Sequence, residues 1–295
     1  MAVLTATPRV AVQNIVLITD FSASSSQALH YAASIARHYG SRIHLVHALS
    51  RGLHDTTPSV SAALTPETES EAEARLLAEA EKCSDLECSR WLLKGSPEEV
   101  VDRLLSFDRT DLVIVGTHAG RRFHRAATAA AAEHFFRHVR CPVLAVGPQA
   151  RPCRSPWDPK HVLLATDLQS TEEAAARCAV FLAREHGARL SLLHVAAPAA
   201  MPYPEDQQVI ARPYFESRLR EILSYRPQLE FPADFRVEFG HDPVAEIVRV
   251  AGKHRSDLIV ISVHREEPWG FHFVHHAYRI VAEAPCPVLI TQRGS

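Results

Sequence analysis

The sequence predicts an α/β protein made of two tandem copies of one doubly wound domain, each with a parallel sheet covered by helices on both faces. Three observations support this fold class. The chain of 295 residues repeats itself at a nearly constant offset, short apolar segments alternate with segments of helical periodicity, and a proline-rich stretch separates the copies. The length also exceeds the roughly 100–200 residues of one ordinary domain.

The first repeated element is an apolar strand that ends in a Thr-Asp pair. Residues 14–20 read Asn-Ile-Val-Leu-Ile-Thr-Asp and residues 161–167 read His-Val-Leu-Leu-Ala-Thr-Asp, an offset of 167 − 20 = 147. We expect both segments to form apolar strands that lead into helices.

A helix is predicted after each of these strands, ending at Gly40 and at Gly187, which are again 147 apart. Each glycine suits the left-handed position that ends a helix, and Ser170 with Glu173 offers a capping box at the start of the second helix. The apolar positions at helical spacing are Ala28, Leu29, Ala32, Ile35, Ala36 and Tyr39 in the first copy, and Ala174, Ala175, Cys178, Phe181 and Leu182 in the second.

The next strands, at residues 42–49 and 189–195, carry His47 and His194 near their ends. Further along, Pro97 and Pro243 suit the first turn of a helix. The acidic, alanine-rich segment 66–82 is expected to be a solvated helix that covers the sheet.

Two later motifs complete the repeat. The segment that begins with Asp111 recurs at Asp257, an offset of 257 − 111 = 146, and Cys-Pro-Val-Leu recurs at an offset of 286 − 141 = 145. Residues 112–115 and 258–261 are apolar throughout, which is typical of parallel strands covered on both faces.

A proline-rich segment lies between the copies. Proline lacks the backbone amide donor, so this segment is not expected to sustain a helix or a central strand. We therefore predict a first domain at residues 10–147, a linker at 148–159 and a second domain at 160–292. The prolines of the linker are Pro148, Pro152, Pro156 and Pro159.

Composition narrows the class of protein. The formal net charge of −2 lacks the basic excess of a nucleic-acid-binding protein. No stretch approaches the roughly 18 apolar residues of a membrane helix, and residues 1–12 have no apolar core of signal-peptide length, so we expect a cytoplasmic protein without membrane partners. Six cysteines without a Cys-x-x-Cys pair favour small buried residues over a zinc or redox motif.

The segments at the predicted strand ends together resemble the universal stress protein family in its tandem form. They are Ile18-Thr-Asp-Phe-Ser, Leu45-Val-His, Val113-Ile-Val-Gly-Thr-His and Arg140-Cys-Pro-Val-Leu, with their counterparts in the second copy. The resemblance spans residues 14–146 and 161–291. It implies a five-stranded parallel sheet in each copy, of the adenine nucleotide alpha hydrolase-like fold, a role in stress tolerance and, in many members, ATP binding.

ATP-binding members carry a glycine-rich signature after the fourth strand, whose backbone amides approach the phosphates. On the first copy the signature begins at Gly116, but three of its positions have become alanine, and Ala130 can donate nothing from its side chain. Gly120 would permit a shifted turn, and arginines at 121, 122 and 125 supply positive charge. The resemblance assigns this loop to Gly116, His118, Ala119, Gly120, Ala129 and Ala130.

The second copy departs further from the signature. Ser262, Arg265 and the neighbourhood of His275 occupy the corresponding places, and Glu266 and Glu267 would repel a polyphosphate. ATP is therefore an expected cofactor of the first copy only, bound at most weakly.

The nucleoside end of the family's site maps onto the two Thr-Asp pairs. In the family the aspartate position contacts the nucleoside; the alternative is that each aspartate only caps the turn into the first helix. By the same resemblance, Ala48 and Val195 line the adenine pocket. The predicted nucleoside-end residues are Thr19, Asp20, Ala48, Thr166, Asp167 and Val195.

Metal and catalytic sites are not predicted. His272, His275 and His276 have the spacing of one helix face, but no carboxylate or cysteine ligand lies next to them in the sequence, so we interpret them as a solvated or packed cluster. The Gly-x-Gly-x-x-Gly, Walker-type and Gly-x-Ser-x-Gly motifs do not occur.

The sequence thus predicts a non-enzymatic cytoplasmic stress-response protein with at most weak adenine-nucleotide binding in the first copy. Two alternatives stay open: a module whose pocket has changed to another small molecule, and a weak ATP-binding or ATP-hydrolysing protein, which would need a metal site and a water-positioning base. The resemblance further implies that residues 142–146 and 287–291 pair within the chain. A homodimer is also open, and no protein partner is identified.

Overall fold

The computed structural model describes residues 12–49, 68–95, 97–105, 109–117, 139–168, 173–196, 204–224, 230–263 and 270–292. In the first half, strands and helices alternate as the sequence predicts. Its elements are β1 (Asn14–Thr19), α1 (Ala23–Tyr39), β2 (Arg42–Leu49), α2 (Glu69–Glu81), β3 (Cys88–Lys94), α3 (Pro97–Leu105), β4 (Leu112–Gly116) and β5 (Val143–Val146).

The second half repeats this order among the described residues and has a further helix, α8, between its last two strands. Its elements are β6 (His161–Thr166), α5 (Glu173–His186), β7 (Arg189–Ala196), α6 (Glu205–Ser224), β8 (Ala233–Phe239), α7 (Pro243–Lys253), β9 (Leu258–Val263), α8 (Gly270–Glu283) and β10 (Val288–Gln292). Among the described helices, none is both long enough and apolar enough to span a bilayer.

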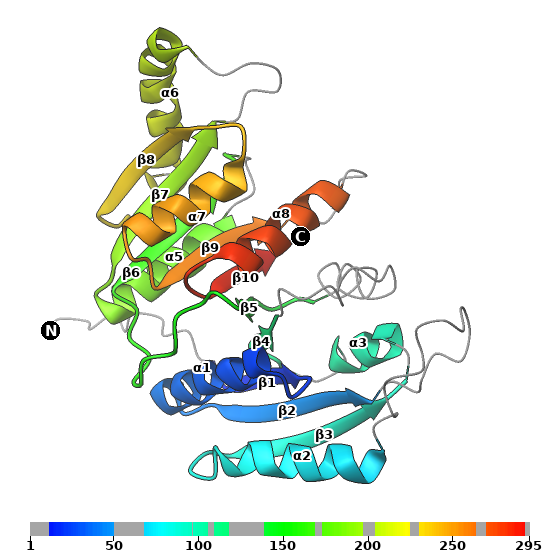
Figure 1. Cartoon of the computed structure of the whole chain (residues 1–295). Helices are drawn as coiled ribbons and strands as arrows, with labels where there is room; N and C mark the ends of the chain where they lie inside the picture. Colours follow the sequence, from blue (N-terminus) through cyan, green and yellow to red (C-terminus); the bar gives the residue numbers. More distant parts are fainter. Residues whose placement is uncertain are drawn as a thin grey trace, which may run out of the picture.

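All ten strands belong to one sheet, in the order β3-β2-β1-β4-β5-β10-β9-β6-β7-β8. Within each half the neighbouring strands are parallel, which confirms the predicted doubly wound class. The halves join where β10 runs antiparallel to β5, with Leu289 opposite Leu144. Figure 1 shows the two halves stacked on either side of this junction.

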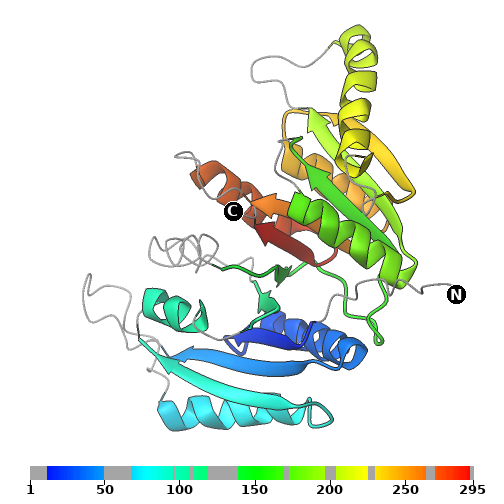
Figure 2. The same cartoon turned by 180° about the vertical axis from the view of Figure 1, so that it is seen from behind.

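Helices cover both faces of the sheet, because the strand residues alternate between two apolar layers. One layer packs residues of α1, α2, α5 and α6 against strand residues such as Leu17 and Leu164. The other packs residues of α3, α7 and α8 against residues such as Val16 and Leu163. Figure 1 shows α7 and α8 in front of the second half, and Figure 2, from behind, shows α5 and α6. Each layer runs through both halves, so the repeat shares a continuous core.

The helix boundaries follow local chemistry. Gly40 and Gly187 have φ of +70° and +58°, as their predicted place at helix ends requires. Helices α3 and α7 begin at Pro97 and Pro243, also as predicted. Helix α2 begins later than residue 66, because Thr68 caps it in a capping box with Glu71.

One predicted helix face is wrong. In α5, Ala175 is buried as expected, but Cys178, Phe181 and Leu182 are only half-buried. The stripe that faces the sheet is rotated toward smaller side chains, because alanines allow the helix to lie close to β6 and β9. The buried residues of α5 are Ala175, Ala176, Ala179, Val180 and Ala183. The capping box proposed at Ser170 falls outside the described residues.

The segment between the halves contains neither helix nor strand in residues 148–159, as its prolines predict. It is nevertheless fixed to both halves. Gln27 Nε2 and the Tyr31 hydroxyl of α1 donate hydrogen bonds of 2.7 Å to Ala150 O and 2.8 Å to Arg151 O. The Arg151 guanidinium donates to backbone carbonyls of Ser256 and Pro285 in the second half.

The repeated aspartates that precede β4 and β9 fix the opposite end of the sheet from the predicted site. The Asp111 carboxylate accepts hydrogen bonds from the backbone amides of Gln13 and Asn14, at 2.8 and 2.9 Å. Asp257 accepts in the same way from the amides of residues 160 and 161. These two aspartates therefore hold the start of one strand of each half beside the start of its neighbour.

Candidate functional site

The strand register brings the predicted nucleoside-end residues of the first half to one edge of the sheet. Thr19 at the end of β1 lies opposite His47 in β2, and Ile18 lies opposite Val115, which places Gly116 beside the same edge. Asp20 follows β1 and Ala48 lies near the end of β2, and both residues are exposed. The carboxyl ends of parallel strands are the usual ligand position in open α/β sheets.

Asp20 holds the turn into α1. Its Oδ1 accepts hydrogen bonds from the Ser22 backbone amide at 3.1 Å and from the Ser25 hydroxyl at 2.5 Å. Ser22 is the N-cap of α1, and its hydroxyl accepts from the Ser25 amide at 3.1 Å. This arrangement corresponds to the turn-capping interpretation of Asp20, while a role in ligand binding stays a prediction.

Residue 21, which follows Asp20, has a strained backbone. Phe21 has φ of +62°, and its counterpart Leu168 has φ of +64°, although neither is glycine. In both halves the amide of this residue donates to the preceding threonine hydroxyl, at 3.0 Å for Thr19 and 2.9 Å for Thr166. The duplicated chain has kept the same unusual turn at both predicted sites.

The repeated histidines support these turns from the neighbouring strand. His47 Nδ1 lies 2.8 Å from Thr19 O, and His194 Nδ1 lies 3.0 Å from Thr166 O. Because a carbonyl oxygen only accepts, both Nδ1 atoms carry the proton. Burial lowers the pKa of His194, so its imidazole is neutral at neutral pH.

Aromatic and basic side chains that the sequence did not single out complete each edge. In the first half the Phe21 ring lies 4.4 Å from the His47 ring, and the Arg75 guanidinium from α2 lies 4.2 Å from the Phe21 ring centre. In the second half Phe215 of α6 lies 4.9 Å from the ring of His194. No sequence signal identified Arg75 or Phe215, because both come from helices distant in the chain.

The two halves differ at Gly116, the last residue of β4, and at its counterpart in β9. A side chain at Gly116 would place its Cβ 2.4 Å from the backbone carbonyl of Ser24, so only glycine allows the first turn of α1 to pack here. The corresponding residue of the second half is Ser262, since 262 − 116 = 146. Its hydroxyl is buried and has no hydrogen-bond partner among the residues that the structure describes.

Several predicted residues fall outside the described part of the chain. The remainder of the phosphate loop, with His118, Ala119, Gly120, Ala129 and Ala130, belongs to this group, as do Arg265, Glu266 and Glu267. The structure places Thr166 in a buried position and Asp167 and Val195 in half-buried positions at the matching edge of the second half. His276 is half-buried in α8, whereas the side chains of His272 and His275 are outside the described residues.

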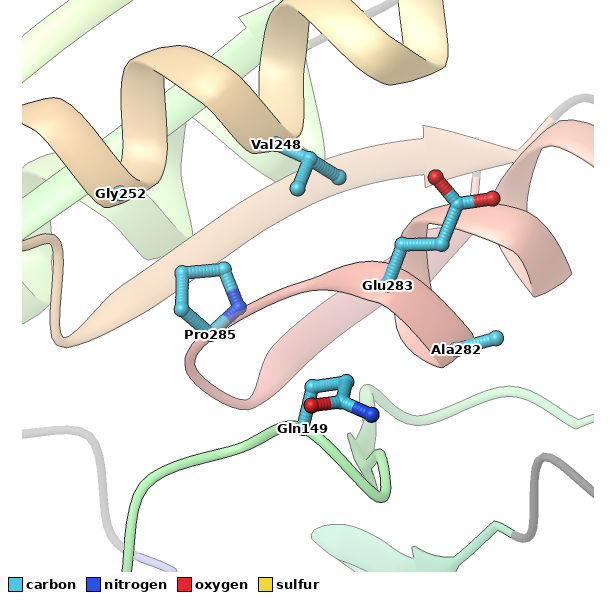
Figure 3. A pocket seen from close by; sticks show the side chains of 6 residues that line it. All are labelled: Gln149, Val248, Gly252, Ala282, Glu283 and Pro285. Atoms are coloured by element: carbon cyan, nitrogen blue, oxygen red, sulfur yellow. The ribbon is translucent and has the colours of Figure 1, made fainter.

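A shallow depression of about 490 Å³ lies away from these strand ends. Figure 3 shows it between α7, the end of α8 and the linker. Within the described residues, it contains none of the predicted site residues. Its lining consists of Gln149, Val248, Gly252, Ala282, Glu283 and Pro285.

Comparison with known proteins agrees with this architecture. A model of the universal stress protein family matches residues 11–147 and 159–292. A universal stress protein from Thermus aquaticus, in the QAH/OAS sulfhydrylase 3' region, is 30% identical over 142 residues, which cover 45% of this chain and 98% of that protein.

Two crystal structures that align with nearly the whole chain share its fold. A universal stress protein from Archaeoglobus fulgidus has a TM-score of 0.65 at 15% identity, covering 96% of this chain and 99% of its own. A putative universal stress protein from Pseudomonas aeruginosa has a TM-score of 0.59 at 17% identity, covering 96% and 94%.

Proposed function

This chain belongs to the universal stress protein family and carries two copies of its domain in tandem; from this premise we propose that it is a non-enzymatic cytoplasmic stress-response protein. Its first half binds an adenine nucleotide weakly, and its second half does not. The two halves thus act as one asymmetric unit.

The contrast between Gly116 and Ser262 supports this proposal most directly. Phosphate sites in this kind of sheet depend on glycines that let backbone segments approach closely, and Gly116 is the signature glycine that the first half retains, packed directly against the first turn of α1. The second half has lost this glycine: Ser262 is the equivalent residue, and its hydroxyl is buried. The acidic residues that follow it in the sequence, Glu266 and Glu267, oppose a polyphosphate there.

The bonds of Asp20 support weak binding. The Asp20 carboxylate already accepts hydrogen bonds from Ser22 and Ser25. A nucleoside hydroxyl that donates to the same carboxylate therefore competes with the bonds that hold the turn. The alanines of the degenerate signature remove the hydroxyl donor at residue 130. The positive charge of Arg75 near Phe21 favours an anionic ligand on this side of the sheet.

Calorimetric titration of ATP and AMP into the full chain tests the proposal. We expect a dissociation constant weaker than about 10 μM, equivalent to about −7 kcal/mol. Asp20→Asn keeps an acceptor for the turn but removes the charge, and we expect it to weaken binding about tenfold, or about 1.4 kcal/mol. The matched control, Asp167→Asn in the second half, is expected to leave binding unchanged.

Four results would change this assignment. Tight ATP binding that depends on Asp20 would show that the degenerate loop still forms a full phosphate site. Equal losses in the Asp20 and Asp167 variants would show two equivalent sites. ATP turnover above that of the denatured protein would establish an enzyme, and mass spectrometry that finds a different small molecule released from the purified chain would establish a changed ligand.

A further inference from the structure

The ends of two equivalent helices meet between the halves of the molecule. His38 and Tyr39 end α1, and Glu185 and His186 end α5. The pairs are related by the repeat, since 185 − 38 and 186 − 39 both equal 147. The duplication therefore brings the same two helix positions together at the junction, and divergence has given them different side chains.

Three metal-ligating side chains converge at this point. One ligand atom each from His38, Glu185 and His186 lies within 4.8 Å of the other two. His38 Nε2 is 3.7 Å from Glu185 Oε1, and the two imidazole rings have centres 4.8 Å apart. The three residues come from helices of different halves, so the convergence is a property of the assembled chain.

The buried imidazole of His186 has an unused nitrogen. Its side chain is 3% exposed, and its Nε2 has no hydrogen-bond partner among the described residues. An unsatisfied buried polar atom costs free energy, so its presence at this position calls for a ligand. The other nitrogen, Nδ1, lies 3.8 Å from Asp158 Oδ1 in the linker. Proteins usually orient a metal-binding histidine through a hydrogen bond from its second nitrogen to a carboxylate, and Asp158 would have to approach by a few tenths of an ångström to make one, because it pairs with Lys160 at 2.5 Å.

Neighbouring groups hold the cluster in place. The Tyr39 hydroxyl donates a 2.6 Å hydrogen bond to Glu185 Oε2 and thereby fixes the carboxylate. Trp157 of the linker packs edge-on against the His186 ring, with centres 4.7 Å apart.

We propose that His38, Glu185 and His186 form a binding site for a divalent transition-metal ion of the zinc class at the junction of the two halves. Two imidazole nitrogens and one carboxylate oxygen are a ligand set that zinc accepts, with a fourth position left for water. His38 is the more exposed of the histidines, with 31% of its side chain accessible, so it can move the short distance needed to close the site. A bound ion would link α1 to α5 and hold the halves together.

This site differs from the histidine cluster that the sequence suggested. The residues of the junction lie far apart in the chain, so no ligand spacing in the sequence points to them. No metal site was predicted from the sequence because no carboxylate or cysteine lies next to the histidines of that cluster.

The test uses the full chain, freed of metal by a chelator and then titrated with Co²⁺ and Zn²⁺. We expect one equivalent of Co²⁺ to bind with the visible absorption bands of a low-coordinate site, Zn²⁺ to displace it, and Zn²⁺ to raise the melting temperature. His186→Gln and Glu185→Gln, which retains an acceptor for Tyr39, should each weaken binding at least about tenfold, and Asp158→Asn about 10–100-fold.

A matched control lies on the same helix. His30 of α1 is exposed, with Nδ1 2.8 Å from Ser26 O, and His30→Ala should bind metal as the wild type does. Failure of the wild-type chain to bind either ion, or binding that survives both His38→Ala and His186→Gln, would overturn the proposal and leave an interfacial histidine stack. Circular dichroism of each variant separates loss of the site from loss of the fold.

Discussion

Replacing His161 by asparagine tests whether His161 is buried in its neutral form in the second half. His161 is 3% exposed at the start of β6, where Nε2 lies 2.9 Å from the Ser191 hydroxyl and Nδ1 lies 3.0 Å from the Ser256 hydroxyl. The first half has Asn14 at the equivalent position, since 161 − 147 = 14. The substitution therefore installs a residue that the same fold already accepts.

The expected change in unfolding free energy with pH follows from the pKa of His161. Burial, with the positive charge of Arg189 and His254, lowers this pKa to about 4. A histidine in an unfolded chain has a pKa of about 6.5, so the unfolded chain takes up the proton first as the pH falls. Stability from this group is complete above about pH 6.5 and decreases toward about pH 4, by about 2 kcal/mol between about pH 7.5 and pH 5.

Urea denaturation of the wild type and of His161→Asn at about pH 7.5 and about pH 5 measures this effect. The other histidines are common to both proteins, so the difference between the two pH dependences isolates His161. We expect the wild type to lose about 2 kcal/mol more unfolding free energy on acidification than the variant. Parallel losses in the two proteins would refute the claim that His161 is buried in the neutral form.

Four further substitutions test the packing of the repeat. Gly116→Ala should destabilise the chain by at least about 1–3 kcal/mol, because the new Cβ would lie 2.4 Å from backbone atoms of α1; an unchanged urea midpoint would contradict this contact. Gly40→Ala and Gly187→Ala should each cost about 1 kcal/mol, because both glycines have positive φ and open space around them; similar losses in both variants are expected, and a gain in either would refute the helix-end assignment. Tyr39→Phe should cost about 1 kcal/mol through the lost hydrogen bond to Glu185, and a double-mutant cycle with Glu185→Ala, which removes the acceptor, that gives no coupling would show that the bond contributes nothing.

Local patterns in the sequence were sufficient for the fold class and most element boundaries. Apolar segments such as residues 112–115 predict buried strands, and a glycine after a segment of helical periodicity, as at residues 40 and 187, predicts the end of a helix. The buried face of α5 was mispredicted because its alanines, which count little in an apolar pattern, permit a closer approach to the sheet than Phe181. For the candidate site, the sequence identified the strand-end residues, and the register brings those of the first half to one edge.

The sequence by itself determined the duplication, the succession of strands and helices along each repeat, and the residues near the carboxyl ends of the strands, because each follows from short local patterns. Tertiary structure alone decided that Arg75 reaches Phe21, that His161 is buried between two serines, and that His38 meets His186. These contacts join residues tens to more than a hundred positions apart. They form only when the helices pack on the sheet and β10 pairs with β5, and no periodic pattern in the sequence predicts that packing.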